Sequence, residues 1–247
     1  MQKLFVDINA DVGEGIGNEA LLIPYLGSCN IACGGHAGTE SSMKPVLELA
    51  KAYSVKVGAH PSFPDKINFG RQPMKMGQLD FSKSITQQIL SLKHLAEQEG
   101  LSLNHVKPHG ALYNQCAKDE NLSAWLVDVV LQIDNSLKIY TPYNSALSRV
   151  AKQSGLEVVE EAFADRNYND DLSLVSRQKS NAIIDEKEAV LEHVLYMLKH
   201  EKVRPINGVG VPLKFQTLCV HGDHKNSVDI LKYLHDNLKT LNTNFET

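Results

Sequence analysis

Seven times along the chain a short apolar segment ends in polar residues and is followed by a helix-like segment. The apolar segments lie at 4–8, 28–33, 55–61, 101–106, 137–141, 156–163 and 217–220. Strands that alternate with helices predict a parallel sheet, because parallel strands need a crossover connection. At 247 residues this pattern predicts an α/β fold with a (β/α) barrel. The barrel is expected to be distorted or incomplete, because about seven parallel strands are expected and the usual barrel has eight. An open doubly wound sheet is the alternative.

The composition is that of an ordinary globular protein, with 43% hydrophobic and 22% charged residues. No linker or low-complexity tract divides residues 1–247, so we expect one domain. A net charge of −4 provides no basic face for nucleic acid, and no run of apolar residues is long enough to span a membrane. Asp7 comes too early for a signal peptide, and four cysteines are too few for a disulfide scaffold. We therefore expect a cytoplasmic protein, with a homo-oligomer left open.

The segment at 101–114 is the clearest of the polar strand ends. Pro108 has no N–H to donate, so sheet pairing must end near it. Gly110 permits a turn or a close approach of the backbone to another group. Lys107 and His109 are poor core residues, which indicates either a functional site or a turn whose polar groups face water.

Polar residues that are far apart in the sequence are expected to meet, because the carboxyl ends of parallel strands share one face. The set comprises Asn9, Asp11, Glu14, Asn30, His36, His60, Lys107, His109, Asp165, Arg166, His221 and Asp223. It is suited to hold a metal, to supply a general acid and base, or to bind a small acidic ligand. Single members also fit structural roles: Asp11 in a glycine turn, Asp223 at a helix N-terminus, and His36 or His60 as a hydrogen-bonded histidine.

Several catalytic motifs are absent from the sequence. There is no H-E-x-x-H, no G-x-S-x-G and no G-x-x-x-x-G-K-[ST], which disfavours zincin proteases, serine hydrolases and a P-loop for ATP. The glycines at 13, 15 and 17 do not have the G-x-G-x-x-G spacing of dinucleotide-binding folds. The histidines at 94, 105, 193, 200 and 235 lie in expected helices or inside a strand, and we assign them no role.

The polar strand ends resemble those of the LamB/YcsF family, whose bacterial members are the A subunits of ATP-dependent 5-oxoprolinases. The matching stretches are 9–14, 30–38, 58–61, 69–71, 106–114, 163–168 and 219–223, in the family order. Four positions differ from the residues expected in the family: Gly35 for Phe, Thr39 for Asp, Asn68 for Gly and Gln72 for Arg. These differences affect loop details and leave the resemblance intact.

The resemblance implies a barrel like those of the glycoside hydrolase and deacetylase superfamily. It also implies hydrolysis of 5-oxo-L-proline to L-glutamate coupled to cleavage of ATP with Mg²⁺, carried out together with 5-oxoprolinase subunits B and C. The coupling is chemically reasonable because an unstrained lactam is a poor electrophile, and phosphorylation of its oxygen would activate it.

On the basis of this resemblance the expected catalytic residues are Asp11, Lys107, His109 and Asp223. His109 or Asp223 would be the general base, and we expect the imidazole of His109 to ionise near neutral pH. The expected substrate-binding residues are Asn9, Asn30, Arg71 and Arg166. The arginines or Lys107 would bind the carboxylate, and the two asparagines would bind the lactam.

A divalent metal bound by His36, His60 and His221 remains open. The alternative function is a stand-alone metal-dependent deacetylase or amidohydrolase acting on a small amide or sugar, with Asp11, His36 and His60 as ligands. A third possibility is a non-catalytic subunit that binds a lactam or a sugar.

Overall fold

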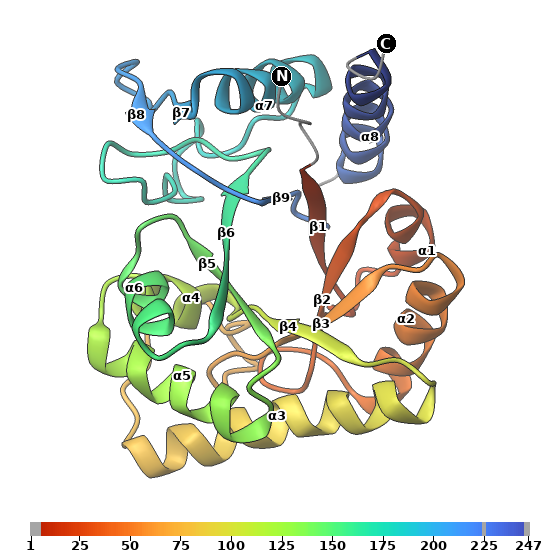
Figure 1. Cartoon of the computed structure of the whole chain (residues 1–247), viewed down its shortest axis with the longest axis vertical. Coiled ribbons are helices and arrows are strands. Elements are labelled where there is room, and N and C mark those ends of the chain that lie inside the picture. The colour runs from red at the N-terminus through yellow and green to blue at the C-terminus, as the bar shows by residue number, and fades with distance from the viewer. Residues whose placement is uncertain (1–5, 224–225, 245–247) are drawn as a thin grey trace.

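A closed barrel of seven parallel strands forms the centre of the computed structural model, which describes residues 6–223 and 226–244 (Figure 1). The strands are β1 (Asp7–Val12), β2 (Ser28–Ala32), β3 (Lys56–His60), β4 (Leu103–Val106), β5 (Lys138–Pro142), β6 (Glu157–Phe163) and β9 (Thr217–Cys219). They follow one another around the barrel, and β9 closes it by pairing with both β6 and β1. The expected α/β barrel of seven strands is therefore confirmed.

Helices surround the barrel on the outside (Figure 1). They are α1 (Glu19–Leu22), the 3-10 helix η1 (Ile23–Tyr25), α2 (Glu40–Ala52), α3 (Gln78–Gln98), α4 (Gly110–Cys116), α5 (Glu120–Ile133), α6 (Ala146–Gln153), α7 (Lys187–His200) and α8 (Ser227–Asn244). Neighbouring helices pack on one another around the ring: α8 on α1, α1 on α2, α2 on α3, α3 on α5 and α5 on α6. Among the described residues, no helix is long and apolar enough to cross a membrane.

Side-chain caps explain where two of these helices begin. Thr39 caps α2: its Oγ1 accepts a hydrogen bond from the backbone N–H of Ser42. Threonine and aspartate both cap helices well, so the departure from the family residue at position 39 preserves this function. Asp119 caps α5 by accepting hydrogen bonds from the backbone N–H groups of residues 121 and 122.

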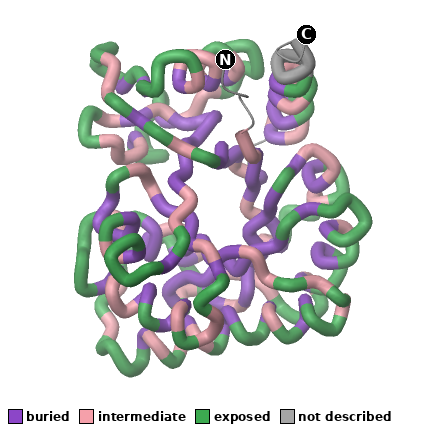
Figure 2. The backbone as a smooth tube through the Cα atoms, in the orientation of Figure 1, coloured by how far each residue is buried: buried purple, intermediate pink, exposed green. Residues whose placement is uncertain are grey.

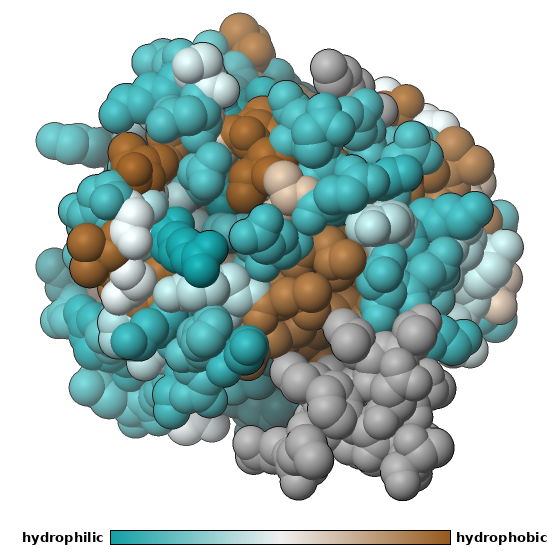
Figure 3. Space-filling view, turned by 90° about the horizontal axis from the view of Figure 1, so that it is seen from above, coloured by the Kyte–Doolittle hydropathy of each residue, from teal (hydrophilic) through white to brown (hydrophobic). Residues whose placement is uncertain are grey.

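The apolar core lies between the barrel and the helices. Helix α3 buries Phe81, Ile85, Ile89 and Leu92 on one face, a spacing of three and four residues that matches the helical period. Figure 2 shows buried residues concentrated on the strands and on the sides of the helices that face them. The face seen from above in Figure 3 is mostly hydrophilic, with apolar side chains gathered near its centre. All four cysteines are buried and free, so no disulfide contributes to stability.

The first strand differs from its prediction. It was expected at 4–8 and runs from Asp7 to Val12, with residues 4 and 5 outside the described part of the chain. Asn9 and Asp11 therefore lie in the strand and not in the loop that follows it. A strand can carry polar residues here because the inside of the barrel supplies partners: Asn9 donates to Glu161 and Thr217, at 2.8 Å each.

Three other elements were not predicted. A helix, α4, begins directly at Gly110, where only a turn was expected. An antiparallel pair, β7 (Lys202–Val203) and β8 (Val211–Pro212), lies in the connection between α7 and β9. Strands of two residues are too short to show a period-2 pattern, so no signal in the sequence indicated them.

Candidate functional site

A cavity of about 550 Å³ opens at the carboxyl ends of the strands. Its lining includes Asp11, Glu14, His60, Arg71, Lys107, His109, Arg166, Arg177, His221 and Asp223. The expectation that residues from both ends of the sequence converge at one rim is confirmed. This cavity is the candidate functional site.

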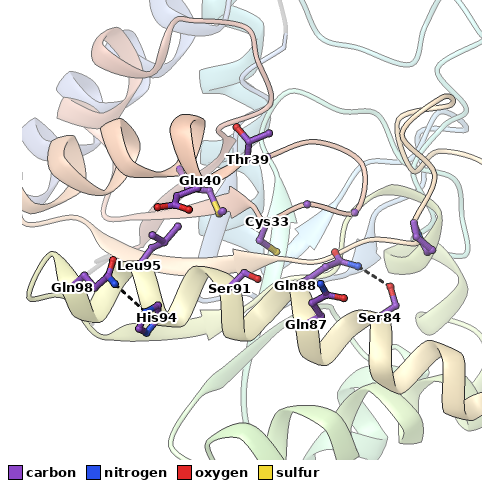
Figure 4. A pocket seen from close by; sticks show the side chains of 15 residues that line it. Cys33, Thr39, Glu40, Ser84, Gln87, Gln88, Ser91, His94, Leu95 and Gln98 are labelled. Atoms are coloured by element: carbon purple, nitrogen blue, oxygen red, sulfur yellow. Dashed lines mark hydrogen bonds between the residues drawn. The ribbon is translucent and has the colours of Figure 1, made fainter.

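A second cavity, of about 600 Å³, lies between α2 and α3 and is lined mainly by hydroxyl, amide and apolar side chains (Figure 4). None of the expected site residues lines it. It does explain the departure at Gly35, because a Cβ there would come within 2.5 Å of Gln88 Oε1 and would also collide with Ser62. Gln88 fills this space and is fixed by hydrogen bonds to the backbone N–H and C=O of Ser62. A side chain at position 35 would therefore displace the ends of the Gln88 and Ser62 side chains.

Lys107 is the centre of a buried polar network inside the barrel. Its Nζ lies 2.9 Å from Glu161 Oε1, 3.1 Å from Asp11 Oδ1 and 3.3 Å from Asn9 Oδ1. Burial opposes its charge, but Asp11 and the other anionic groups outweigh this effect and raise the pKa of Lys107 well above its usual value. Lys107 is therefore a permanent cation that balances two carboxylates.

The two asparagines expected to bind substrate belong to the same network. The Nδ2 of Asn30 donates to Asn9 and to Asp11, at 2.8 Å each, and the Nδ2 of Asn9 donates to Glu161. Neither asparagine lines the cavity. Their amide N–H groups are already used within the protein, so the geometry favours a structural role for both.

Glu14, His36, His60 and His109 form a group that we call the histidine cluster. One nitrogen or carboxylate oxygen from each residue lies within 4.8 Å of the others. The rings of His36 and His109 stack at a centroid distance of 3.6 Å and an angle of 4°. The four residues come from three strand ends and from the start of α4, so the barrel topology alone brings them together.

Gly110 allows His109 to reach the histidine cluster. Its φ of +53° lies in the left-handed region, and a Cβ at this position would be only 2.7 Å from the carbonyl oxygen of Gly70. That carbonyl accepts the backbone N–H of Ala111. The chain must therefore approach the loop that carries Phe69 and Gly70 closely, which requires glycine.

Backbone carbonyls determine which nitrogens of the cluster carry protons. His60 Nδ1 lies 2.8 Å from the carbonyl oxygen of Lys107, and His109 Nε2 lies 3.0 Å from that of Phe69. A carbonyl oxygen only accepts, so both of these nitrogens are protonated. The remaining nitrogens, His60 Nε2 and His109 Nδ1, face each other at 3.0 Å. With both rings neutral, two lone pairs oppose one another, and either a shared proton or a cation is needed between them.

The pKa values in the cluster reflect its burial. Burial, with repulsion from His60, lowers the pKa of His36 to about 3 and that of His109 to about 2. Burial and the neighbouring Asp11 raise the pKa of Glu14 to about 7. The expectation that His109 ionises near neutral pH is therefore wrong, because its protonated form would be poorly solvated and close to other imidazoles.

The donor set of the cluster fits a divalent transition metal. Imidazole nitrogens and a carboxylate are common ligands of zinc and related ions, and carbonyl groups behind the ligands fix their orientation, as at His60 and His109. His36 Nδ1 is buried and has no hydrogen-bond partner among the described residues. The expected ligands His36 and His60 belong to this group, whereas His221 lies outside it. Glu14 and His109 complete it.

Asp223 is held between two guanidinium groups at the rim. Its Oδ2 accepts from Arg71 at 2.9 Å and from Arg177 at 2.7 Å. Burial opposes its ionisation, but the hydrogen bond and charge of Arg177 lower the pKa of Asp223 below its usual value. A carboxylate stabilised in this way is a weak base, so the geometry favours an ion-pair role for Asp223 over the expected role of general base.

Arg166 reaches the cavity lining but uses its donors elsewhere. Its Nε and Nη2 donate to the backbone carbonyls of Ala182 and Val175, at 3.1 and 2.6 Å. It thereby holds in place the segment that carries Arg177. Of the two arginines expected to bind substrate, Arg71 is the more available, since its side chain is 48% exposed.

The sequence analysis missed Glu161, His105 and Arg177 as site residues. Glu161 is buried in β6 and also accepts from the hydroxyl of Tyr113 at 3.0 Å. His105 is buried in β4, with its Nε2 2.7 Å from Asn30 Oδ1. Glu161 is one of three glutamates in its strand and His105 follows an asparagine, so the sequence did not distinguish either residue from its polar neighbours. Arg177 lies in an irregular segment that offers no signal either.

Comparison with known proteins identifies the family of the chain. The model of the LamB/YcsF family matches residues 6–247. The A subunit of the 5-oxoprolinase of Pyrococcus horikoshii is 43% identical over 93% of this chain and 92% of its own. The corresponding protein of Haemophilus influenzae is 39% identical over 95% of this chain and 96% of its own. The crystal structure of the lactam utilization protein from Thermus thermophilus is 33% identical, covers 96% of both chains and superposes with a TM-score of 0.89.

Proposed function

The chain belongs to the LamB/YcsF family, and on that premise we propose that it is the A subunit of a 5-oxoprolinase, which hydrolyses 5-oxo-L-proline to L-glutamate. The observation that carries the proposal is the 43% identity, over 93% of the chain, to a relative named as the A subunit of a 5-oxoprolinase. The family model matches residues 6–247, which include every residue that lines the cavity.

The cavity suits a small anionic amide. Arg71 and Arg177 at the rim share a single carboxylate, Asp223, which leaves an excess positive charge for the carboxylate of the substrate. Below the rim, the ring of Phe163 offers an apolar surface for the methylene groups of the lactam. The histidine cluster lies on the same cavity wall, next to Asp11.

We further propose that the reaction is coupled to ATP, with Mg²⁺, through partner subunits B and C. The unstrained lactam is a poor electrophile, and the sequence has no phosphate-binding loop of the G-x-x-x-x-G-K-[ST] type. A nucleotide site on a partner subunit accounts for both facts. The chain alone should then show negligible ATP-dependent turnover.

We also propose that Glu14, His36, His60 and His109 hold a divalent metal ion. The opposed lone pairs of His60 and His109 are the specific observation in favour, since a cation relieves their repulsion. A bound metal ion would polarise the lactam carbonyl as a Lewis acid. This site also supports the second candidate function, a stand-alone metal-dependent amidohydrolase.

One set of assays separates the two functions. The chain is assayed for glutamate release from 5-oxoproline, alone and with subunits B and C, with and without ATP, and its metal content is measured. Turnover only with the partners and ATP supports the 5-oxoprolinase proposal. Turnover by the isolated chain that needs metal and no ATP would replace it with the second candidate. Glu14→Gln and His60→Asn should each lower metal content, which tests the metal site independently of activity.

A further inference from the structure

A buried carboxylate and an imidazole form a hydrogen-bonded pair at the cavity, outside the histidine cluster. Asp165, which follows β6, is 1% exposed. Its Oδ1 accepts a hydrogen bond from His221 Nδ1 and its Oδ2 accepts one from the backbone N–H of His221, each at 2.9 Å. Two bonds from one residue to one carboxylate fix both the position and the orientation of His221.

The contact with Asp165 also fixes the tautomer of His221. Burial opposes ionisation of Asp165, but the charge and hydrogen bonds of His221 lower the pKa of Asp165 below its usual value. The ionised carboxylate only accepts, so the proton of the neutral imidazole is on Nδ1 and the lone pair is on Nε2. No hydrogen bond among the described residues involves Nε2, and His221 lines the cavity.

Packing holds the ring in this orientation. The ring of Phe163 stacks on that of His221 at a centroid distance of 5.3 Å and an angle of 20°. At the next residue, Gly222, a Cβ would lie 2.8 Å from the carbonyl oxygen of Asp11. The backbone after β9 therefore packs directly against the end of β1, which places His221 beside Asp11 at the cavity.

Glu14, His60 and His109 belong to the histidine cluster, and the remaining candidate bases are bound by other side chains. His109 faces His60 and Glu14, and Asp223 is bound by two guanidinium groups. Asp11 accepts hydrogen bonds from Asn30 and Lys107. His221 thus differs from all of them in presenting an oriented and unused lone pair to the cavity.

We propose that His221 is the general base of the hydrolysis and that Asp165 is its positioning residue. The inference rests on the proposed function. Once ATP has phosphorylated the lactam oxygen, Nε2 takes a proton from a water molecule as the water oxygen forms a bond to the former carbonyl carbon. When the adduct collapses, the C–N bond breaks and the imidazolium returns its proton to the ring nitrogen, which becomes the amine of the product. The carboxyl phosphate that remains is hydrolysed by a second water molecule to the carboxylate and inorganic phosphate, so atoms balance and the imidazole is regenerated.

The assembled complex with ATP provides the kinetic test. His221→Asn should lower kcat by about 10²-fold or more, with a smaller change in KM. Asp165→Asn should also lower kcat, because an amide can stabilise the wrong tautomer, and it should shift the acid limb of the pH–rate profile that His221→Asn abolishes. The charged groups facing this ring are Asp11 on β1, Asp165 after β6 and Asp223 after β9, and His221→Asn leaves all three intact. His94→Asn on α3 is the matched control and should have no effect.

A spectroscopic measurement tests the pair without turnover. In the isolated chain, ¹⁵N spectra of the histidine rings should show His221 protonated at Nδ1, and Asp165→Asn should change this. A proton on Nε2 in the wild type, or a His221→Asn complex with wild-type kcat and an unchanged acid limb, overturns the assignment. A wild-type complex that fails to hydrolyse 5-oxoproline refutes the proposed function itself, and the base assignment fails with it. An active wild-type complex with an equally active His221→Asn variant is a different outcome, which refutes only the base assignment.

Discussion

Replacing Lys107 by methionine should strongly destabilise the fold. Methionine has a similar length and fits the same space, so the change removes the charge and the hydrogen bonds with little loss of packing. Asp11 and Glu161 would then lie in the barrel interior without their shared cation. Breaking a buried ion pair by removing one partner costs about 3–5 kcal/mol, because the remaining charge is poorly solvated.

The size of the effect can be read from thermal unfolding. For a protein of this length, 1 kcal/mol corresponds to about 2–4 °C, so Lys107→Met should lower Tm by about 6–20 °C. Lys138→Met is the matched control, since Lys138 also pairs with a glutamate, Glu157, at 2.6 Å, but the two side chains are 34% and 62% exposed. A surface pair contributes about 0–1 kcal/mol, so the control should hardly change Tm.

The pH dependence and a second substitution identify the cause. Without Lys107, burial disfavours the charged forms of both carboxyl groups, so the folded variant binds protons more readily than the unfolded chain does. The variant should therefore be least affected below about pH 4, where both groups are protonated, and the deficit should grow as pH rises. Adding Glu161→Gln should recover part of the loss. Equal small changes of Tm for Lys107→Met and Lys138→Met, or no recovery in the double variant, would refute the buried-charge reasoning.

Three further predictions concern the cluster, the rim and the partners. Burial lowers the pKa of His109 to about 2. The contribution of the neutral imidazole to stability is therefore present above the unfolded-state pKa of 6.5 and is lost as pH falls below 6.5. His109→Asn should reduce the fall in unfolding free energy that is measured between about pH 7 and pH 4. Arg177→Gln should raise KM for 5-oxoproline by about tenfold with little change of kcat, since it removes one guanidinium that shares Asp223; an unchanged KM would exclude it from substrate binding. Ile67, 96% exposed in a loop of the rim, is expected to contact a partner subunit, so Ile67→Glu should weaken co-purification of subunits B and C, while Leu79→Glu on α3, 81% exposed, should not.

Local patterns were sufficient to predict the barrel and the convergence of its polar strand ends. Apolar segments followed by Asp11, His60, Lys107 and His221 are visible in the sequence, and parallel topology then places these residues at one end of the sheet. The end of β1 was misplaced because Asn9 is polar, and its burial depends on partners more than 100 residues away. Polar residues inside a closed barrel break the rule that predicts strands from apolar runs.

The roles of individual residues could not be predicted, because they depend on which atom of a side chain contacts which partner. His109 and His221 are both histidines that follow strands, and the sequence suggested the first as base and the second as a metal ligand. We propose the reverse assignment: the carbonyl of Phe69 turns His109 Nδ1 toward the cluster, whereas Asp165 turns His221 Nε2 toward the cavity. These partners lie 40 and 56 residues away in the sequence, and only the fold brings them together.

Asp11 links the two parts of the site. Its Oδ1 accepts from Lys107 at 3.1 Å, whereas its Oδ2 lies 3.4 Å from His60 Nε2. Burial opposes the charge of Asp11, but His60 and Lys107 outweigh it and lower its pKa well below the usual value. The carboxylate therefore stays ionised, and its Oδ2 faces His60 Nε2, which also faces His109 Nδ1. Its negative charge favours a proton or a cation between these nitrogens, and Lys107, which keeps Asp11 ionised, contributes to that property of the site.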